Sequence, residues 1–122
     1  MMRRWFIMLI LLFGSAVAPA PCFGQTAAYA PINCSKASNP AETTICGNYG
    51  LGQDEARLAT LYGLITSLVA MGQRGDIMDA QRKWIAVRDA CKSDAQCLAH
   101  AYQTRIGDLA KAFDALAKRG PF

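Results

Sequence analysis

A chain of 122 residues has room for one domain, and two independently cored domains are not expected at that length. The chain is 52% hydrophobic and has 13 Lys and Arg against 9 Asp and Glu. The first 24 residues raise both the hydrophobic share and the net positive charge, because they are largely apolar and hold two arginines and no acid. Without them the balance is 11 against 9, about +2, which excludes a polyanion-binding patch built on excess charge. We therefore expect no nucleic-acid partner.

Residues 1–24 have the layout of a secretory signal peptide. Arg3 and Arg4 form a positive segment, residues 5–13 are an uncharged apolar run, and cleavage is expected after Gly24. The apolar run is too short to span a bilayer comfortably, so no stable membrane anchor should remain after cleavage. The protein is predicted to be periplasmic or secreted.

Two other export signals fit this leader less well. Cys22 would suit a lipoprotein, but Pro21 precedes it where lipid attachment needs a small residue other than proline. Arg3 and Arg4 half-match a twin-arginine signal, but the segment after them is very apolar and the polar flanking residues are missing. General secretion is the prediction, with residues 25–33 as a flexible lead-in and residues 34–119 as the folded domain.

Four cysteines remain after cleavage: Cys34, Cys46, Cys91 and Cys97. An even number in a small exported domain predicts two disulfides. Of the three possible pairings, Cys34 with Cys46 and Cys91 with Cys97 is favoured, because each closes a short segment across a predicted helix start. A zinc site normally shows closely spaced C-x2-C pairs, and a thiol-redox site needs C-x-x-C. Neither motif is present, so no metal or other cofactor is expected.

The sequence predicts an all-α fold of three antiparallel helices plus a short N-terminal one, because no segment alternates polar and apolar residues as a strand would. The short helix should run from Pro40 to Cys46, with Asn39 as its cap and Gly47–Gly50 as the break after it. The first long helix should run from about Gly52 to Met71.

The other two long helices follow from turn and capping signals. Gly72 and Gly75 should end the first, and Asp76 should cap the second. The capping box that begins at Ser93 should open the third, which the basic residues, glycine and proline after residue 117 should end.

Apolar residues recur along these helices at spacings of three and four. The first long helix carries Leu51, Leu58, Leu61, Ile65 and Leu68, with Asp54 in the one polar slot. The second carries Ile77, Ala80, Trp84, Val87 and Cys91, and the third carries Leu98, Tyr102, Ile106, Leu109, Phe113 and Leu116.

Equal counts back from a turn place residues at equal height, which gives the register of the helices. Trp84 then lies level with Leu61 and Leu64 on one neighbour and with His100 and Ala101 on the other, so it should be central in the core. The third helix outruns the second, so Phe113 and Leu116 either project as a partner contact with a basic border or cover the core beside Met71 and Ile77.

Several segments together resemble the LprI-type lysozyme inhibitor N-terminal domain over roughly residues 34–110. They are Cys34, Glu42-Thr43-Thr44-Ile45-Cys46, the run from Leu51 to Leu58 with Tyr62, the run from Gln81 to Cys91, then Cys97 and Tyr102-Gln103-Thr104-Arg105-Ile106. The resemblance implies a small exported helical domain with two disulfides. It also implies a function named after a member lipoprotein that inhibits lysozyme. This sequence has no lipobox, so lipid anchoring is not implied for it.

The motif residues suit a structural role better than a chemical one. They are Glu42, Arg57, Gln81, Trp84, Arg88, Asp89, Tyr102 and Arg105. Mixed charges on the helices of a small bundle usually form ion pairs, and the register predicts Asp89 near Arg57, Arg88 near Glu42 or Glu55, and Asp79 level with Arg105 and Ile106.

Catalysis is not expected. His100, the only histidine, should be half-buried beside Trp84 and has no evident nucleophile or carboxylate partner. Met71 and Met78 lack the His or Met cluster that copper would need. Two protein-binding functions remain: an inhibitor that blocks the cleft of a muramidase, or a structural or protein-interaction module of the cell envelope. The slight positive charge argues mildly against the first, since lysozymes are commonly basic and an inhibitor gains association rate from opposite charge.

Overall fold

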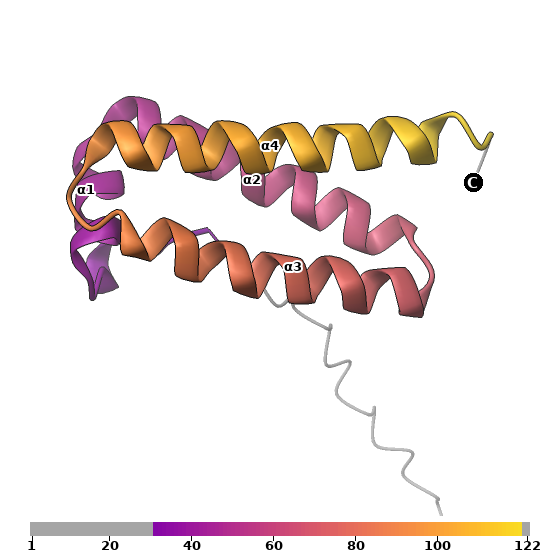
Figure 1. Ribbon diagram of the computed structural model, residues 1–122, viewed down its shortest axis with the longest axis horizontal. Helices are drawn as coiled ribbons and strands as arrows, with labels where there is room; N and C mark the ends of the chain where they lie inside the picture. The colour runs from indigo at the N-terminus through magenta and orange to yellow at the C-terminus, as the bar shows by residue number, and fades with distance from the viewer. Residues whose placement is uncertain (1–30, 121–122) are drawn as a thin grey trace, which may run out of the picture.

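The computed structural model describes residues 31–120, so the predicted signal peptide and the lead-in up to residue 30 lie outside the described part. The described chain forms the 3₁₀ helix η1 (Cys34–Lys36) and four α-helices, α1 (Pro40–Gly47), α2 (Tyr49–Leu68), α3 (Met71–Ala90) and α4 (Ala95–Ala117). No strand occurs among these residues, and the predicted all-α class is confirmed. Successive long helices run in opposite directions, with α1 at one end of the bundle (Figure 1).

The start of α1 follows the predicted capping signal. The side chain of Asn39 accepts a hydrogen bond from the Glu42 N–H at 2.9 Å, and Pro40 occupies the first helical position. The predicted four-residue break after α1 is a single residue, because Asn48 itself caps α2 by accepting from the Leu51 N–H at 3.1 Å. The helix α2 therefore begins three residues before the predicted start.

The turn between α2 and α3 lies at Val69 and Ala70, so its predicted place at Gly72 and Gly75 is wrong. Both glycines lie inside α3, and its N-cap Ala70 makes no side-chain capping bond in place of the predicted Asp76. Val69 is 7% exposed, and its burial holds the chain reversal against the low helix propensity of the glycines. The register of α2 against α3 that was derived from the glycine turn is therefore wrong as well.

Because α3 begins early, it nearly matches α4 in length. It has 20 residues against 23 in α4, so the predicted projection of the last two turns of α4 is reduced to less than one turn. Counted from the α3–α4 corner, residues at equal height on the two helices have numbers that add up to about 185, so Leu116 lies level with Val69 at the turn. Leu116 is 5% exposed and belongs to the core.

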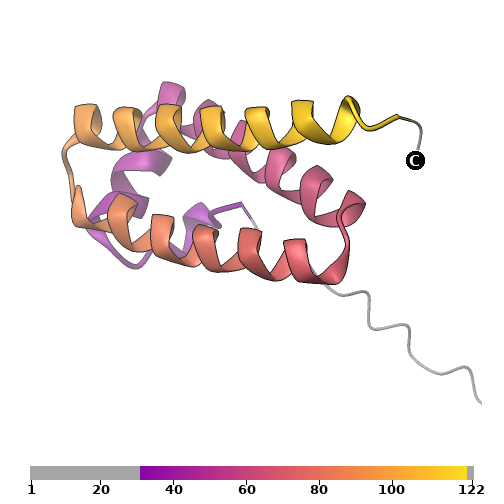
Figure 2. The ribbon, with the colours of Figure 1, turned by 45° about the vertical axis from the view of Figure 1, so that its right-hand side comes forward.

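The core lies mainly between α2 and α4, which pack together most extensively, while α3 packs against α4 more than against α2. Figure 2 shows α4 beside both of the other long helices. The buried apolar residues are Ala41, Ile45, Leu51, Leu58, Tyr62, Ile65, Val69, Trp84, Leu98, Tyr102, Ile106, Leu109 and Leu116. No helix of the described residues is both long and apolar enough to cross a membrane.

The buried faces of α2 and α3 are rotated from the predicted stripes. On α2 the second row of buried residues contains Glu55 and Tyr62 and continues to Val69, the C-cap, whereas Leu68 is 38% exposed. On α3 the buried positions include Gln81 and Arg88, whereas Val87 is 61% exposed. The sequence pattern failed here because it assigns apolar residues to the core, and this core contains hydrogen-bonded polar side chains.

Both predicted disulfides are confirmed. Cys34 bonds to Cys46, and Cys91 bonds to Cys97, each pair with Cα atoms 5.6 Å apart. The first joins η1 to the end of α1, and the second closes the corner between α3 and α4. We call the part formed by η1, α1 and this corner the disulfide end, because these segments lie at the same end of the bundle (Figure 1) and both bonds join residues within them.

Candidate functional site

Arg88 lies at the centre of a polar network beneath the disulfide end. Its side chain is 3% exposed, and its Nε and Nη2 atoms lie 2.8 and 2.7 Å from Oδ1 of Asp89. Nη2 also lies 3.8 Å from Oε1 of Glu42, which confirms the predicted pairing of Arg88 with Glu42. The network thereby ties the last turn of α3 to the first turn of α1.

Asp89 completes the link between these helices. Its Oδ2 accepts a hydrogen bond from Nδ2 of Asn39 at 3.2 Å, so the residue that caps α1 also holds the end of α3. The predicted partner of Asp89, Arg57, is exposed on α2 instead. The predicted pairing is wrong because both oxygens of Asp89 are turned toward α1 and its own helix.

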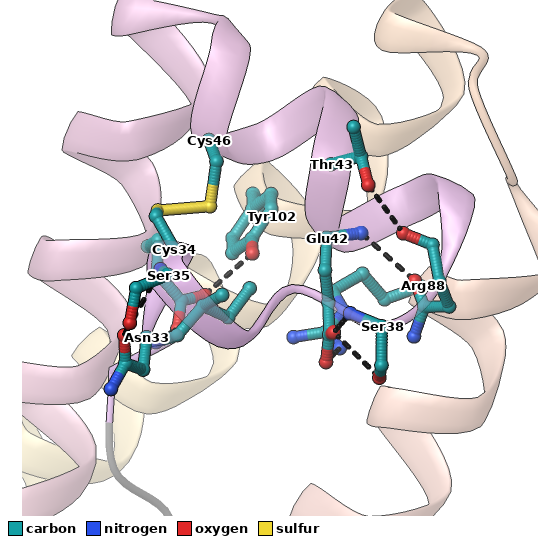
Figure 3. Close-up of a disulfide and its surroundings, with 12 residues drawn as sticks. Asn33, Cys34, Ser35, Ser38, Glu42, Thr43, Cys46, Arg88 and Tyr102 are labelled. Carbon is teal, nitrogen blue, oxygen red and sulfur yellow. Dashed lines mark hydrogen bonds and ion pairs between the residues drawn. A yellow bond between two sulfur atoms is a disulfide. The ribbon is translucent and has the colours of Figure 1, made fainter.

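Glu42 is the third member of the network. Its Oε2 accepts hydrogen bonds from the Ser38 N–H at 2.8 Å and from the Ser38 hydroxyl at 3.1 Å, as Figure 3 shows. The backbone hydrogen bond from Ser38 lowers the pKa of the Glu42 carboxyl, with smaller lowering contributions from the Ser38 hydroxyl and Arg88 and an opposing one from partial burial. Glu42 is therefore held in its ionised form.

A second buried pair joins α2 to α4. The hydroxyl of Tyr102 donates to Oε2 of Glu55 at 2.5 Å, and the N–H of Ile32 donates to Oε1 of the same carboxylate at 3.1 Å. Burial raises the pKa of Tyr102, and the hydrogen bond to Glu55 raises it further. Sequence reasoning placed Asp54 in the core slot and missed Glu55 as the partner of Tyr102. The sequence signal for burial of Glu55 was its position four residues after Leu51 and three before Leu58, on the same face of the helix.

Trp84 is 8% exposed, so its predicted core position is confirmed. Its indole N–H donates to the carbonyl of Ala101 at 3.0 Å, as the predicted register of α3 on α4 requires. The ring of Tyr102 meets it edge-on at 5.2 Å, and the Arg88 guanidinium lies 5.6 Å from its centroid. His100 is exposed, and its predicted burial beside Trp84 is wrong.

Gln81 and Arg105 form the third buried polar contact, between α3 and α4. Nε of Arg105 donates to Oε1 of Gln81 at 2.9 Å, and its Nη2 lies 3.5 Å from the carbonyl of Ile77. Desolvation lowers the pKa of Arg105. Asp79, predicted level with Arg105, forms an ion pair with Arg82 on the surface.

Seven of the eight motif residues thus contact one another or the backbone inside the bundle, and Arg57 alone is exposed. No group of three or more His, Cys, Asp or Glu side chains that could hold a metal occurs among the residues described. The arrangement fixes the helices relative to one another.

One shallow pocket of about 330 Å³ opens on the surface of the disulfide end, between η1, α1 and the start of α2. Its lining includes Ile32, Ile45, Gln53 and Glu55, and also Tyr49, which is 84% exposed. The hydrogen bonds of Glu55 to Ile32 and Tyr102 hold this acid in the wall of the pocket.

The corner between α3 and α4 is the other surface feature of the disulfide end. Lys92 is exposed and has a φ of 50°, which non-glycine residues rarely adopt. Asp94, not the predicted Ser93, caps α4 by accepting from the N–H groups of Gln96 and Cys97, both at 3.0 Å. Sequence reasoning predicted the disulfide here but not the backbone geometry at Lys92.

The predicted partner contact at the end of α4 is mostly covered. Leu116 is in the core, and Phe113 is half-buried against it. Met71, predicted to share in covering them, is 85% exposed. Only part of Phe113 therefore remains available to a partner.

The comparisons with known proteins give one positive result. A family model described as "Lysozyme inhibitor LprI" matches residues 34–109, which is 76 of the 122 residues. No curated protein and no solved structure matches the chain. The matched segment spans both disulfides, the buried polar contacts and the α3–α4 corner.

Proposed function

Because the chain belongs to the LprI lysozyme inhibitor family, we propose that it is an exported protein that binds a muramidase and blocks its cleft. The observation that carries this proposal is the family match over residues 34–109, which covers nearly all of the helical domain. The protein acts by binding and is not an enzyme.

The rigidity of the disulfide end supports inhibition by a preorganised surface. Two short disulfide loops and the contacts of Arg88, Asp89 and Asn39 fix η1, α1 and the corner before any partner arrives. A surface that is already ordered loses little conformational entropy on binding, which raises affinity. In this proposal the motif residues Glu42, Gln81, Trp84, Arg88, Asp89, Tyr102 and Arg105 act through the fold, and Arg57 is left to the surface.

Export to the periplasm or the medium fits both the disulfides and the target. Disulfides persist in oxidising compartments, and muramidases act on the cell wall outside the cytoplasm. The signal layout of residues 1–24 supports the same location. The partner in this proposal is a protein, with neither nucleic acid nor a stable membrane anchor involved.

A turbidity assay tests the proposal. Purified oxidised protein without its leader is added to egg-white lysozyme acting on a bacterial cell-wall suspension, and lysis should slow at near-stoichiometric dose. Reduced and alkylated protein is the control, and it should inhibit less. Undiminished lysis at excess protein, with goose-type and bacterial muramidases as well, would reject the proposal.

A second candidate, a protein-interaction module of the cell envelope, is favoured by apolar side chains at the opposite end of the bundle. Leu64 is 47% exposed, Leu68 38% and Met71 85%, all near the α2–α3 turn. Affinity capture from envelope extract separates the two functions. A specific envelope partner whose binding is lost in Leu68→Ser and Met71→Ser, together with no effect on lysis, would favour the second.

A further inference from the structure

The corner between α3 and α4 has the only non-glycine residue with positive φ in the described chain, Lys92 at 50°. Glycine or asparagine would adopt this conformation more easily than lysine does. Strained backbone that persists in a folded protein is held there by its surroundings and concentrates at functional sites. A lysine in the position after the C-cap of α3, where glycine is usual, is therefore a candidate functional residue.

The surroundings of Lys92 fix its position from both sides. Its N–H donates to the Asp89 carbonyl at 3.1 Å, and the Asp94 N–H donates to the Cys91 carbonyl at 3.1 Å. The disulfide between Cys91 and Cys97 closes the corner around it. Asp89 is itself held by Arg88 and Asn39, so the backbone at Lys92 rests on a network that reaches α1.

The corner is also a narrow and exposed part of the molecule. It lies at the extremity of the disulfide end in both views of the bundle (Figures 1 and 2). Residues 92–97 are all exposed, and Lys92 supplies the one cationic side chain among them. A tight connection between two helices can enter a cleft that the full width of the bundle cannot.

The cleft of a muramidase supplies the matching charge. Glycoside hydrolases of this kind place two carboxyl groups on either side of the bond that they cleave, in a cleft shaped for a polysaccharide. The side chain of Lys92, exposed on a backbone that the corner holds in place, carries the charge complementary to that pair. A local pairing of this kind also explains how a slightly basic inhibitor can bind a basic enzyme, because complementarity is decided where the surfaces meet.

Lys36 is the other lysine of the disulfide end, and it lacks this combination. It is exposed on η1, which has three residues, and its backbone is not strained. Lys36 also lies inside a disulfide loop, but the Cys34–Cys46 loop has a sequence separation of 12, whereas the Cys91–Cys97 loop around Lys92 has a separation of 6. Lys36 is therefore a matched control within the same end of the molecule.

We propose that the α3–α4 corner is the inhibitory element and that the Lys92 ammonium group enters the muramidase cleft and pairs with its catalytic carboxyl groups. This inference rests on the proposed function, and it names the part of the chain that performs it.

Binding of variants to egg-white lysozyme, measured by titration calorimetry, tests the inference. Lys92→Gln removes the charge and keeps the side-chain length, and Lys92→Gly removes the charge and the strain. Both should raise Kd at least tenfold, since truncating one partner of a buried charge pair has a large effect. Lys92→Gly should also raise the melting temperature, so its lost affinity could not be due to unfolding.

Lys36→Gln and Lys111→Gln are the controls, because each removes the same charge from another exposed position. Lys111 lies 16 residues after the start of α4, about 24 Å along the helix from the corner. Both controls should keep Kd within about twofold of the unmodified protein, a change of the size expected for a rim charge. A lysozyme with its catalytic glutamate changed to glutamine should bind the unmodified protein more weakly but lose little further affinity for Lys92→Gln, which shows that the two groups are coupled.

The outcomes separate this inference from the proposed function. If the unmodified protein binds lysozyme and Lys92→Gln binds equally well, the corner is not the inhibitory element while the proposed function stands. A larger loss in Lys36→Gln than in Lys92→Gln would also overturn the inference. If the unmodified protein binds no muramidase, both fail.

Discussion

Arg88 illustrates how a charged residue is accommodated inside this small bundle. Its guanidinium is paired with Asp89 and Glu42 and lies beside the ring of Trp84. A buried charge is tolerated when it is paired and hydrogen-bonded, but removing one partner leaves the other uncompensated. Replacement of Arg88 should therefore lower the free energy of unfolding more than replacement of the exposed Arg57.

Trp84 is predicted to be essential for stability. Trp84→Ala should lower the free energy of unfolding by about 3–5 kcal/mol, because it removes a large buried ring and its hydrogen bond to Ala101. Val87→Ala, on the exposed side of α3, should change it by less than about 0.5 kcal/mol. Urea denaturation measures both. A folded Trp84→Ala protein of unchanged stability that has lost partner binding would show that Trp84 is a contact residue.

Glu42 should make stability depend on acid pH. Its pKa in the folded protein lies below the ordinary value of 4.5, so its contribution is complete above that pH and is lost as the pH falls through the folded pKa. Glu42→Gln should be less stable at pH 7, and the two proteins should converge as the pH falls below the folded pKa of Glu42.

Thermal unfolding at several pH values tests this expectation for Glu42. Ser38→Ala is the control, because it removes the hydroxyl donor but keeps the backbone N–H that is the main cause of the shift. It should retain most of the pH dependence. A constant stability difference between Glu42→Gln and the unmodified protein across this range would contradict the account.

At the scale of elements, the glycines at the start of α3 should respond to substitution by alanine in the opposite way to glycines in a turn. Gly72 and Gly75 are helical, and an added Cβ would meet no atom within 4 Å at either. Gly75→Ala should therefore stabilise the protein by about 0.5–1 kcal/mol, and Gly72→Ala by less because it lies at the helix end. Chemical denaturation measures this. Gly120→Ala is the control, and it should give no gain in stability because Gly120 has a φ of 103°. If Gly75→Ala instead destabilised the protein, the turn would have to lie at Gly75.

The two disulfides should both be complete and both contribute to stability. Alkylation of the mature protein without reductant, followed by mass spectrometry, should show no added label. Loops closed over 12 and 6 residues should each stabilise by about 2–3 kcal/mol, so reduction should markedly lower the melting temperature. The double variant Cys91→Ala, Cys97→Ala should lose only the stabilisation that the Cys91–Cys97 disulfide contributes. Two or more alkylated cysteines in the untreated protein would contradict the disulfide assignment.

At the scale of the whole molecule, the sequence was sufficient for the number of α-helices, their order and the cysteine pairing. Asn39 and Pro40 mark the start of α1 through local chemistry that a sequence displays directly. The α2–α3 turn could not be found in this way, because Val69 and Ala70 carry no turn signal and the reversal is held by the burial of Val69. Tertiary packing decided that boundary.

The candidate site was less predictable because it depends on polar groups at core positions and on one backbone angle. Glu55, Gln81 and Arg88 occupy buried positions that apolar periodicity assigns to their neighbours. Their partners come from other helices, and only the folded chain brings them together. The positive φ of Lys92 arises from the closed corner. The residue type does not indicate it, since lysine does not favour this conformation.

The central claim is that the protein blocks a muramidase by occupying its cleft. The most direct test is titration of the oxidised mature protein into egg-white lysozyme, with and without a chitin oligosaccharide filling the cleft. A one-to-one complex is expected, and its apparent affinity should fall as the oligosaccharide concentration rises. A complex that is indifferent to the oligosaccharide, or no complex at all, would contradict it.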